Sequence, residues 1–314
     1  MFLGVDGGGT RTSFCLLNES GRVVATFQAG TCYYLSIGLE ASRQVLADGV
    51  EQICKKAGIA PAEIAYAFFG LPAYGEGSSV IDTLNAMPRD ILGHDRYQCG
   101  NDMICGWAGS LGGTDGINVI AGTGSMTYGE RNGVGARCGG WGEIFGDEGS
   151  AYWIGCRGLS AFTRMSDGRL PQGPLYELLK QHFALTSDLD VIDIVLNEWH
   201  ADRTRIAELA LTVIEAAHRR DPQALTILED AVGELALIVE TTARLLGFEA
   251  SECIPVSYSG GLFREKTFLD AFTQALSDLG IRHELRKPLH TPDIGAALYA
   301  ARLADVSLDV ITTD

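Results

Sequence analysis

A glycine-rich turn occurs twice in this chain, each time directly after a short apolar run that ends in Val or Ile. The first copy is Gly-Val-Asp-Gly-Gly-Gly-Thr-Arg-Thr over 4–12, and the second is Ala-Gly-Thr-Gly-Ser over 121–125. Glycines at such turns let backbone N–H groups approach an anion, and the hydroxyls of Thr10, Thr123 and Ser125 add donors. Two such loops indicate a nucleotide held between two halves, with Asp6 as the carboxylate nearest its phosphates and a magnesium ion.

The turns that follow each glycine loop are spaced alike. Thr10 lies 11 residues before Gly21, and Thr123 lies 10 residues before Gly133. This similarity favours an internal duplication. A chain of 314 residues also exceeds the usual size of a single core. We therefore expect two domains, 1–113 together with 295–314 and 114–294, joined by a short hinge near 112–116 and by a final helix.

Apolar patterning predicts an α/β fold in which a strand hairpin is followed by strand–helix–strand crossovers, giving mixed sheets covered by helices. The expected strands are 2–5, 13–17, 23–28, 64–69, 96–100, 117–120, 126–130, 254–257 and 281–285. The expected helices are 39–57, 78–85, one starting near 151, 206–217, 227–246 and 293–303.

Charge and hydropathy exclude two classes of partner. The formal net charge is −16, from 24 basic and 40 acidic residues, and phosphate-backbone binding needs clustered basic charge, so we expect no nucleic acid partner. No apolar run reaches the roughly 18 residues that a bilayer span needs. The first residues also lack the charged segment and cleavage site of a leader. We expect a soluble, cytoplasmic protein without membrane contact.

The eight cysteines form no C-x-x-C pair, and several lie in apolar contexts. We interpret them mainly as reduced core residues, because zinc or cluster ligation would require paired spacing. The six histidines fit no metal or catalytic-triad pattern either.

Asn101 and Asp102 follow a predicted strand and precede a stretch of small residues, 106–113. A carboxylate at such a strand end can project into a cleft. Asp102 is therefore the candidate general base, which would accept the proton of an attacking hydroxyl and contribute about 10² to 10⁴ in rate. The alternative is an Asx turn that closes the strand.

The segment 139–150 is the most unusual stretch, with glycines surrounding Trp141, Asp147 and Glu148 just before an apolar helix. This composition is typical of a loop shaped to a polar ligand, with carboxylates as acceptors for sugar-like hydroxyls. The alternative for Trp141 is a core tryptophan. Ser259-Gly260-Gly261, at another strand end, would let a flat ring approach the backbone.

These segments together resemble the N-acetylglucosamine kinase branch of the sugar kinase/Hsp70/actin superfamily, which is often grouped with the BadF/BadG/BcrA/BcrD ATPases. The resemblance runs in order through 4–12, 101–102, 122–125, 138–154 and 259–261. The most specific motif is Cys-Gly-Gly-Trp-Gly-x-x-x-Gly-Asp-Glu-Gly-Ser at 138–150.

The resemblance implies duplicated ribonuclease H-like (actin/hexokinase-type) domains around a central cleft that holds ATP, Mg²⁺ and an amino sugar. It implies Asp102 as the base and Asp6 as the magnesium residue. The implied nucleotide-binding residues are Gly8, Gly9, Thr10, Arg11, Thr12, Gly122, Thr123, Gly124, Ser125, Ala217, Gly260 and Gly261. The implied substrate-binding residues are Asn101, Asp102, Gly140, Trp141, Gly142 and Asp147. A homodimer is the family's expected assembly.

One departure from the family pattern concerns the acceptor. The family usually carries an asparagine in the loop after the third strand, where this chain has Cys32 and Tyr33. Neither side chain replaces an amide, which both donates and accepts. The departure leaves the exact sugar open and does not affect phosphoryl transfer.

The predicted function is ATP-dependent phosphorylation of the 6-hydroxyl of an amino sugar, foremost N-acetylglucosamine, with glucosamine or N-acetylmuramic acid as alternative acceptors. A second hypothesis is a BadF-type ATPase that activates a partner enzyme through a shared iron–sulfur cluster, which would require cysteines at a dimer interface. A third is a sugar-sensing module that has lost catalysis, against which Asp6 and Asp102 argue.

Overall fold

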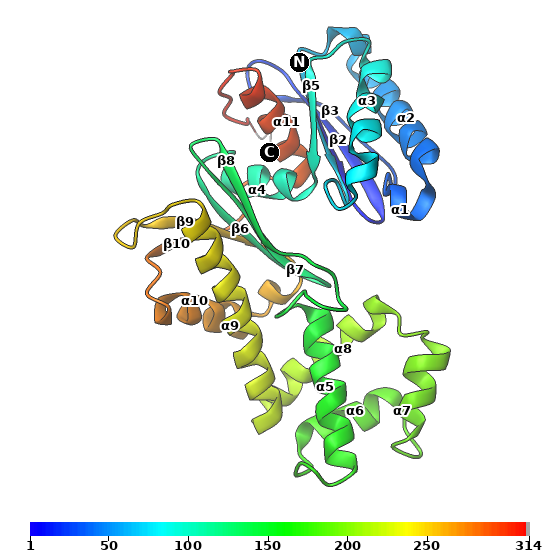
Figure 1. The fold of residues 1–314 in the computed structure, drawn as a ribbon, viewed down its shortest axis with the longest axis vertical. Helices are drawn as coiled ribbons and strands as arrows, with labels where there is room; N and C mark the ends of the chain where they lie inside the picture. The colour runs from blue at the N-terminus through cyan, green and yellow to red at the C-terminus, as the bar shows by residue number, and fades with distance from the viewer. Residues whose placement is uncertain (312–314) are drawn as a thin grey trace. The chain divides into compact units, whose positions relative to one another are not determined.

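A computed structural model describes residues 1–311, which fall into two compact units (Figure 1). Unit 1 comprises Met1–Gly116 and the segment from Arg286 onward, and unit 2 comprises Ile117–Leu285. The last three positions of the first predicted domain, 312–314, lie outside the described residues. Within residues 1–311, no helix is long and apolar enough to cross a bilayer.

Unit 1 is built on a five-stranded mixed sheet in the order β3-β2-β1-β4-β5. The strands are β1 Phe2–Gly7, β2 Arg11–Leu17, β3 Val23–Gly30, β4 Tyr66–Leu71 and β5 Tyr97–Asn101. β1, β2 and β3 pair antiparallel, whereas β1, β4 and β5 run parallel. Since parallel strands end at the same edge of a sheet, the last residues of β1 and β5 lie near one another.

Helices cover both faces of this sheet (Figure 1). α1 Tyr34–Ile37, α2 Leu39–Ala57 and α3 Ile81–Leu92 come between β3 and β5 in the chain, α4 Met103–Leu111 follows β5, and α11 Pro292–Leu303 ends the fold. Leu46, Val50 and Ile53 of α2 pack on Val5 and Phe14 of the sheet. α11 contacts α4, β1 and β4, which brings the end of the chain onto its first strand.

Unit 2 repeats the same strand order, read from its other edge as β10-β9-β6-β7-β8. The strands are β6 Gly116–Ala121, β7 Ser125–Arg131, β8 Val134–Gly139, β9 Ile254–Ser259 and β10 His283–Arg286. β6 and β9 are parallel, and β7 and β8 are antiparallel. The predicted duplication is therefore confirmed, because the first strand of each sheet has the second and fourth as neighbours.

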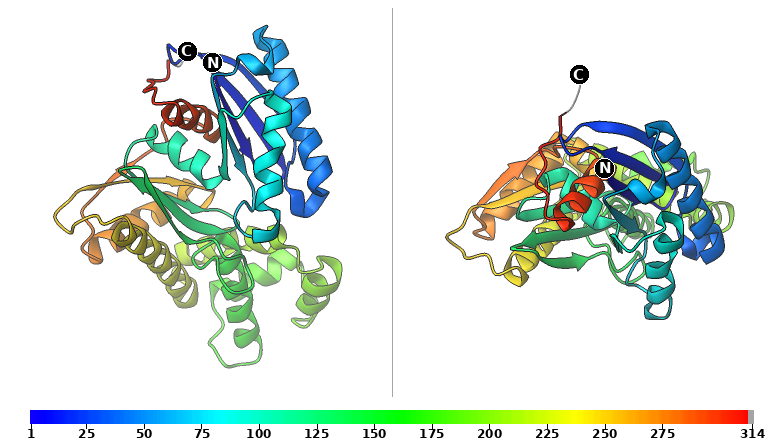
Figure 2. Two further views of the ribbon diagram at one scale, coloured as in Figure 1. Left: turned by 45° about the horizontal axis from the view of Figure 1, so that its top comes forward. Right: turned by 90° about the horizontal axis from the view of Figure 1, so that it is seen from above.

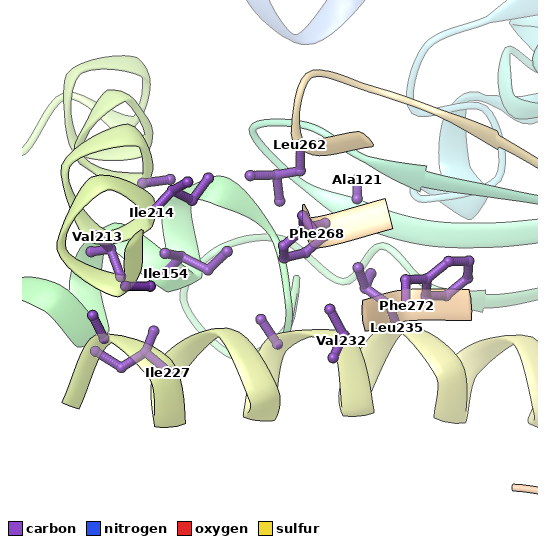
Figure 3. Packing of buried hydrophobic residues seen from close by; sticks show 14 of the residues in the cluster. Ala121, Ile154, Val213, Ile214, Ile227, Val232, Leu235, Leu262, Phe268 and Phe272 are labelled. Carbon is purple, nitrogen blue, oxygen red and sulfur yellow. The ribbon is translucent and has the colours of Figure 1, made fainter. Parts of the chain in front are cut away.

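The helices of unit 2 are α5 Ala151–Ser166, α6 Pro174–Phe183, α7 Asp190–Ile192, α8 Arg203–His218, α9 Pro222–Leu245 and α10 Lys266–Asp278, with a π-helical turn at Asp193–Glu198. Helices α5 to α8 gather at one end of this unit (Figure 2), and α9 packs against β7 and β8. Figure 3 shows Val232 and Leu235 of α9 meeting Phe268 and Phe272 of α10, which joins the helices into one apolar core.

The cysteines match their predicted role in the core. Cys15, Cys32, Cys54, Cys99 and Cys105 are buried, and all eight are free thiols in the described part of the chain. Cys138 and Cys156 are half-buried, and Cys253 is exposed.

Candidate functional site

The first glycine turn joins β1 to β2 at the edge of the sheet of unit 1. The Gly8 amide donates to the Arg11 carbonyl (2.8 Å), which closes the turn, while Gly9, Thr10 and Arg11 are exposed at its tip. A Cβ at Gly9 would meet no atom of residues 1–311 within 4 Å. The turn therefore presents open backbone to solvent, as an anion-binding loop requires.

The loop after β3 is attached to this turn. Thr31 Oγ1 donates to the Gly8 carbonyl (2.8 Å), and the Cys32 sulfur packs so closely on Gly7 that a Cβ there would lie 2.6 Å from it. Burial raises the pKa of Cys32 to about 11, so the thiol is neutral near pH 7. In the loop where the resemblance expects an asparagine, Cys32 is thus a buried, uncharged side chain.

An acidic centre lies at the same edge of the sheet. Asp6 is near the end of β1, Asp102 directly follows β5, and Asp293 lies in the first turn of α11. Burial, followed by the negative charges of Asp102 and Asp293, raises the pKa of Asp6 from 3.8 to about 7, against a smaller opposing effect of Arg11. A carboxyl whose pKa is raised by burial together with a nearby carboxylate is typical of a functional site.

This shift predicts a pH-dependent stability. A group whose folded pKa is raised contributes stability below its unfolded pKa, near 3.8, and that contribution is lost as pH rises through about 7. Asp6→Asn removes the cost of ionising this buried carboxyl, so we expect the variant without nucleotide or magnesium to be more stable than wild type at pH 8 by on the order of 4 kcal/mol. Urea unfolding at pH 5 and pH 8 measures this difference, and equal stabilities at pH 8 would contradict it.

Asn101 and Asp102 have different roles in the structure. The Asn101 side chain accepts a hydrogen bond from the Met103 amide (3.1 Å) and donates one to the Tyr74 carbonyl (3.1 Å). The Asx turn that was the alternative for this strand end is therefore made by Asn101, whose amide links the end of β5 to the loop after β4. Asp102 is the N-cap residue of α4, but its side chain makes no capping hydrogen bond.

The second glycine turn joins β6 to β7 in unit 2. The Gly122 amide donates to the Gly124 carbonyl (2.9 Å), and Thr123 is exposed at the tip. Ser125 is buried, and its hydroxyl donates to the Glu148 carbonyl (2.6 Å). Thr123 is therefore accessible to a phosphate. Ser125 instead connects the turn to the 139–150 segment.

The structure brings Gly260 to this turn. Its φ is +109°, and a Cβ there would lie 2.2 Å from the Ala121 carbonyl oxygen, so only glycine fits between the ends of β9 and β6. Gly261 is exposed beside it. Ala217, which the resemblance places near adenosine, lies in α8 with 7% exposure among the core residues of unit 2.

The segment 139–150, here called the glycine-tryptophan loop, turns sharply through Gly139, Gly140 and Gly142, all with positive φ. Arg137 donates to the carbonyls of Gly139 and Gly140, and its guanidinium lies 6.0 Å from the ring centroid of Trp141. Trp141 is 70% exposed. The alternative of a core tryptophan is therefore wrong, and the indole is available to a ligand.

Asp147 lies at the centre of this loop. It is 3% exposed and has φ of +57°, which is uncommon for a residue other than glycine. Burial raises the pKa of its carboxyl, while Arg203 and the backbone amides of Gly142 and Ser125 lower it. The carboxylate thus joins the glycine-tryptophan loop to the second glycine turn.

Sequence reasoning missed Arg203. It is the first residue of α8 and binds Asp147 and Glu143, yet 56 residues separate it from Asp147. No motif marks it, because only the folding of α8 against α5 brings it to the loop. Among residues 1–311, no group of three or more His, Cys, Asp or Glu side chains forms a metal cluster.

Along nearly its whole length this chain is similar to known proteins. The profile of the BadF/BadG/BcrA/BcrD ATPase family matches residues 3–300. N-acetyl-D-glucosamine kinase of Dictyostelium discoideum is 27% identical, with 96% of this chain and 97% of that protein covered. N-acetylmuramic acid/N-acetylglucosamine kinase of Clostridium acetobutylicum is 29% identical, with 88% and 90% covered.

Solved structures show the same fold. A protein from Chromobacterium violaceum, provisionally named an N-acetylglucosamine kinase, has a TM-score of 0.68 at 28% identity, covering 94% of this chain and 97% of that one. A ROK hexokinase from Thermus thermophilus has a TM-score of 0.62 at 15% identity, covering 96% and 99%. The latter likeness concerns the fold alone. Together they confirm the predicted two-domain fold of the actin/hexokinase type.

Proposed function

Because this chain belongs to the BadF/BadG/BcrA/BcrD ATPase family, we propose that it is an ATP-dependent kinase that phosphorylates the 6-hydroxyl of an amino sugar, foremost N-acetylglucosamine. The names of the relatives support the class of substrate, since they include kinases of N-acetylglucosamine, N-acetylmuramic acid and glucosamine. The observation that carries the proposal is the pair of carboxylates Asp6 and Asp102 beside the first glycine turn.

Asp102 would act as the general base. Its carboxylate, at a strand end and not used as a helix cap, would take the proton of the sugar hydroxyl as that oxygen attacks the terminal phosphorus. The bond from that phosphorus to the bridging oxygen then breaks, and ADP leaves with the electron pair. The negative charge of Asp102 is one cause of the raised pKa of Asp6, so the two carboxyl groups interact electrostatically.

The two glycine turns would bind ATP. We assign phosphate contacts to Gly8, Gly9 and Thr10 of the first turn, with Arg11 and Thr12 adjoining, and to Thr123 of the second turn with its neighbours 122–125. Gly260 and Gly261 would lie against the adenosine. Because Ala217 is buried, it would line the back of the adenosine site and no more.

Magnesium fits Asp6. The charges around this carboxyl are mainly negative, and oxygen ligands in such a setting suit a hard divalent cation. When bound, the ion would supply positive charge that offsets the phosphate charges during transfer. Asp6 would hold the magnesium ion, directly or through water, while Asp102 would act as the base for the acceptor hydroxyl.

The amino sugar would bind the glycine-tryptophan loop. Trp141 offers an exposed apolar face, Gly140 and Gly142 offer backbone groups, and Asp147 offers a carboxylate oxygen to a hydroxyl. Asn101 would support the substrate side of the site through the loop at Tyr74 that it holds. The acceptors next in order are glucosamine and N-acetylmuramic acid, which the names of two relatives include.

Measuring ADP release against a panel of amino sugars tests this function. We expect turnover only when the acceptor is present, with N-acetylglucosamine fastest, and a product phosphorylated at oxygen 6 by NMR. ADP release that ignores every amino sugar would contradict the proposal. We also propose that the protein forms a homodimer. Analytical ultracentrifugation would measure its molecular mass in solution.

The alternative of a BadF-type activator is disfavoured by the cysteines. A cluster shared by two copies needs surface thiolates from each, whereas Cys253 is the one exposed cysteine among residues 1–311. A purified protein that lacks visible absorption would exclude it.

A further inference from the structure

Arg203 contacts two carboxylates of the glycine-tryptophan loop at once. Its Nη1 lies 3.2 Å from Oε2 of Glu143, and its Nη2 lies 2.5 Å from Oδ2 of Asp147. The Asp147 side chain is 4% exposed, and that of Glu143 is 34% exposed. The planar fork of a guanidinium can hold two acceptors in fixed directions, which a lysine ammonium cannot.

The same guanidinium lies against the second glycine turn. A Cβ at Gly124 would fall 2.7 Å from Arg203 Nη2 and 2.7 Å from Asp147 Oδ2. Arg203 and Asp147 therefore fill the space that a side chain at Gly124 would need. The Nε atom of Arg203 is buried and has no hydrogen-bond partner within residues 1–311. Leaving a buried donor unsatisfied costs stability, which the two contacts of Arg203 with the loop must offset.

We propose that Arg203 is a positioning residue for the amino-sugar acceptor: through Oδ2 of Asp147 it holds this buried carboxylate, and with it the glycine-tryptophan loop, in one conformation beside the acceptor. This inference rests on the proposed function. In this role Arg203 need not contact the sugar. It acts through Asp147, whose contacts with the amides of Gly142 and Ser125 complete the arrangement.

Electrostatics give the proposal a distinct signature. Burial and the charge of Glu143 raise the pKa of Asp147, and Arg203 provides the largest opposing effect. When the guanidinium is removed, the pKa of Asp147 rises further, and less of the carboxylate is ionised at any given pH. The sugar KM of such a variant should therefore be worst at low pH and recover as pH rises.

Steady-state kinetics of Arg203→Met, Arg203→Lys and the control Arg205→Met test this proposal. Arg205 lies on the same helix, but its guanidinium packs over the Trp199 ring at 5.8 Å instead of on the loop. With N-acetylglucosamine as acceptor, we expect Arg203→Met to raise the sugar KM about tenfold or more, the loss typical of a charged hydrogen bond, with the ATP KM within about twofold. The difference should shrink between pH 6 and pH 8.5, Arg203→Lys should recover part of it, and Arg205→Met should match wild type.

Amide hydrogen exchange supplies a readout that needs no substrate. We expect faster exchange over 140–147 in Arg203→Met than in wild type or Arg205→Met, with unchanged exchange in α5. A sugar KM for Arg203→Met that equals wild type across this pH range, or sugar and ATP KM values that rise equally, would overturn the inference while leaving the proposed function intact. If wild type phosphorylates no amino sugar, the proposed function fails first, and the wild-type assay reveals that before any variant is compared.

Discussion

Asp102→Asn is expected to lower the rate of amino-sugar phosphorylation by about 10² to 10⁴ or more, because an amide cannot take up the proton of the attacking hydroxyl. The side chain is nearly isosteric and does not cap α4, so the fold should persist. ATP binding should persist as well, since the glycine turns are unchanged. Initial rates of ADP formation at saturating sugar, with calorimetric titration of ATP, measure the two effects separately.

Asp82→Asn is a matched control for this change. Asp82 is an exposed carboxylate in the first turn of α3 in the same unit, and its replacement should leave the rate near that of wild type. If Asp102→Asn retained near-normal turnover, Asp102 could not be the base, and the role would have to pass to another carboxylate such as Asp6.

Gly295→Ala should strongly destabilise unit 1, although alanine is the better helix former. A Cβ at Gly295 in α11 would lie 2.1 Å from the Gly109 amide nitrogen and 2.3 Å from the Cys105 carbonyl oxygen of α4. These are backbone atoms of a packed helix, which cannot rotate away. We expect a loss of about 3 kcal/mol, at the upper end of overpacking effects, measured by urea unfolding.

Gly233→Ala provides the opposite case. Gly233 lies in α9 and is exposed, and in the described part of the chain no atom lies within 4 Å of a Cβ built there. At this position helix propensity determines the effect, so the same substitution should raise the free energy of unfolding by about 0.5–1 kcal/mol. Equal effects at the two glycines would show that close approach of α11 to α4 does not control the stability of unit 1.

Local patterns predicted much of the fold. The bounds predicted for the helix at 39–57 match α2, and the strands that flank both glycine turns lie where apolar runs placed them. α4 was not predicted, because Cys105, Trp107 and Leu111 are buried on a helix that is apolar nearly all round and shows no 3.6-residue period. β8 was not predicted either. It is a glycine-rich edge strand whose one neighbouring strand within residues 1–311 is β7.

In the candidate site, too, some features follow from local sequence and others only from tertiary packing. Short segments already contain the glycine turns, Asp102 and the glycine-tryptophan loop, because their function depends on residues adjacent in the chain. Three other features depend on how distant segments pack. They are the electrostatic effect of Asp102 and Asp293 on Asp6, the close approach of Gly260 to Ala121, and the ion pair of Arg203 with Asp147. Periodicity determines which local elements form. Only closure of the chain into two sheets and their helices decides which side chains meet.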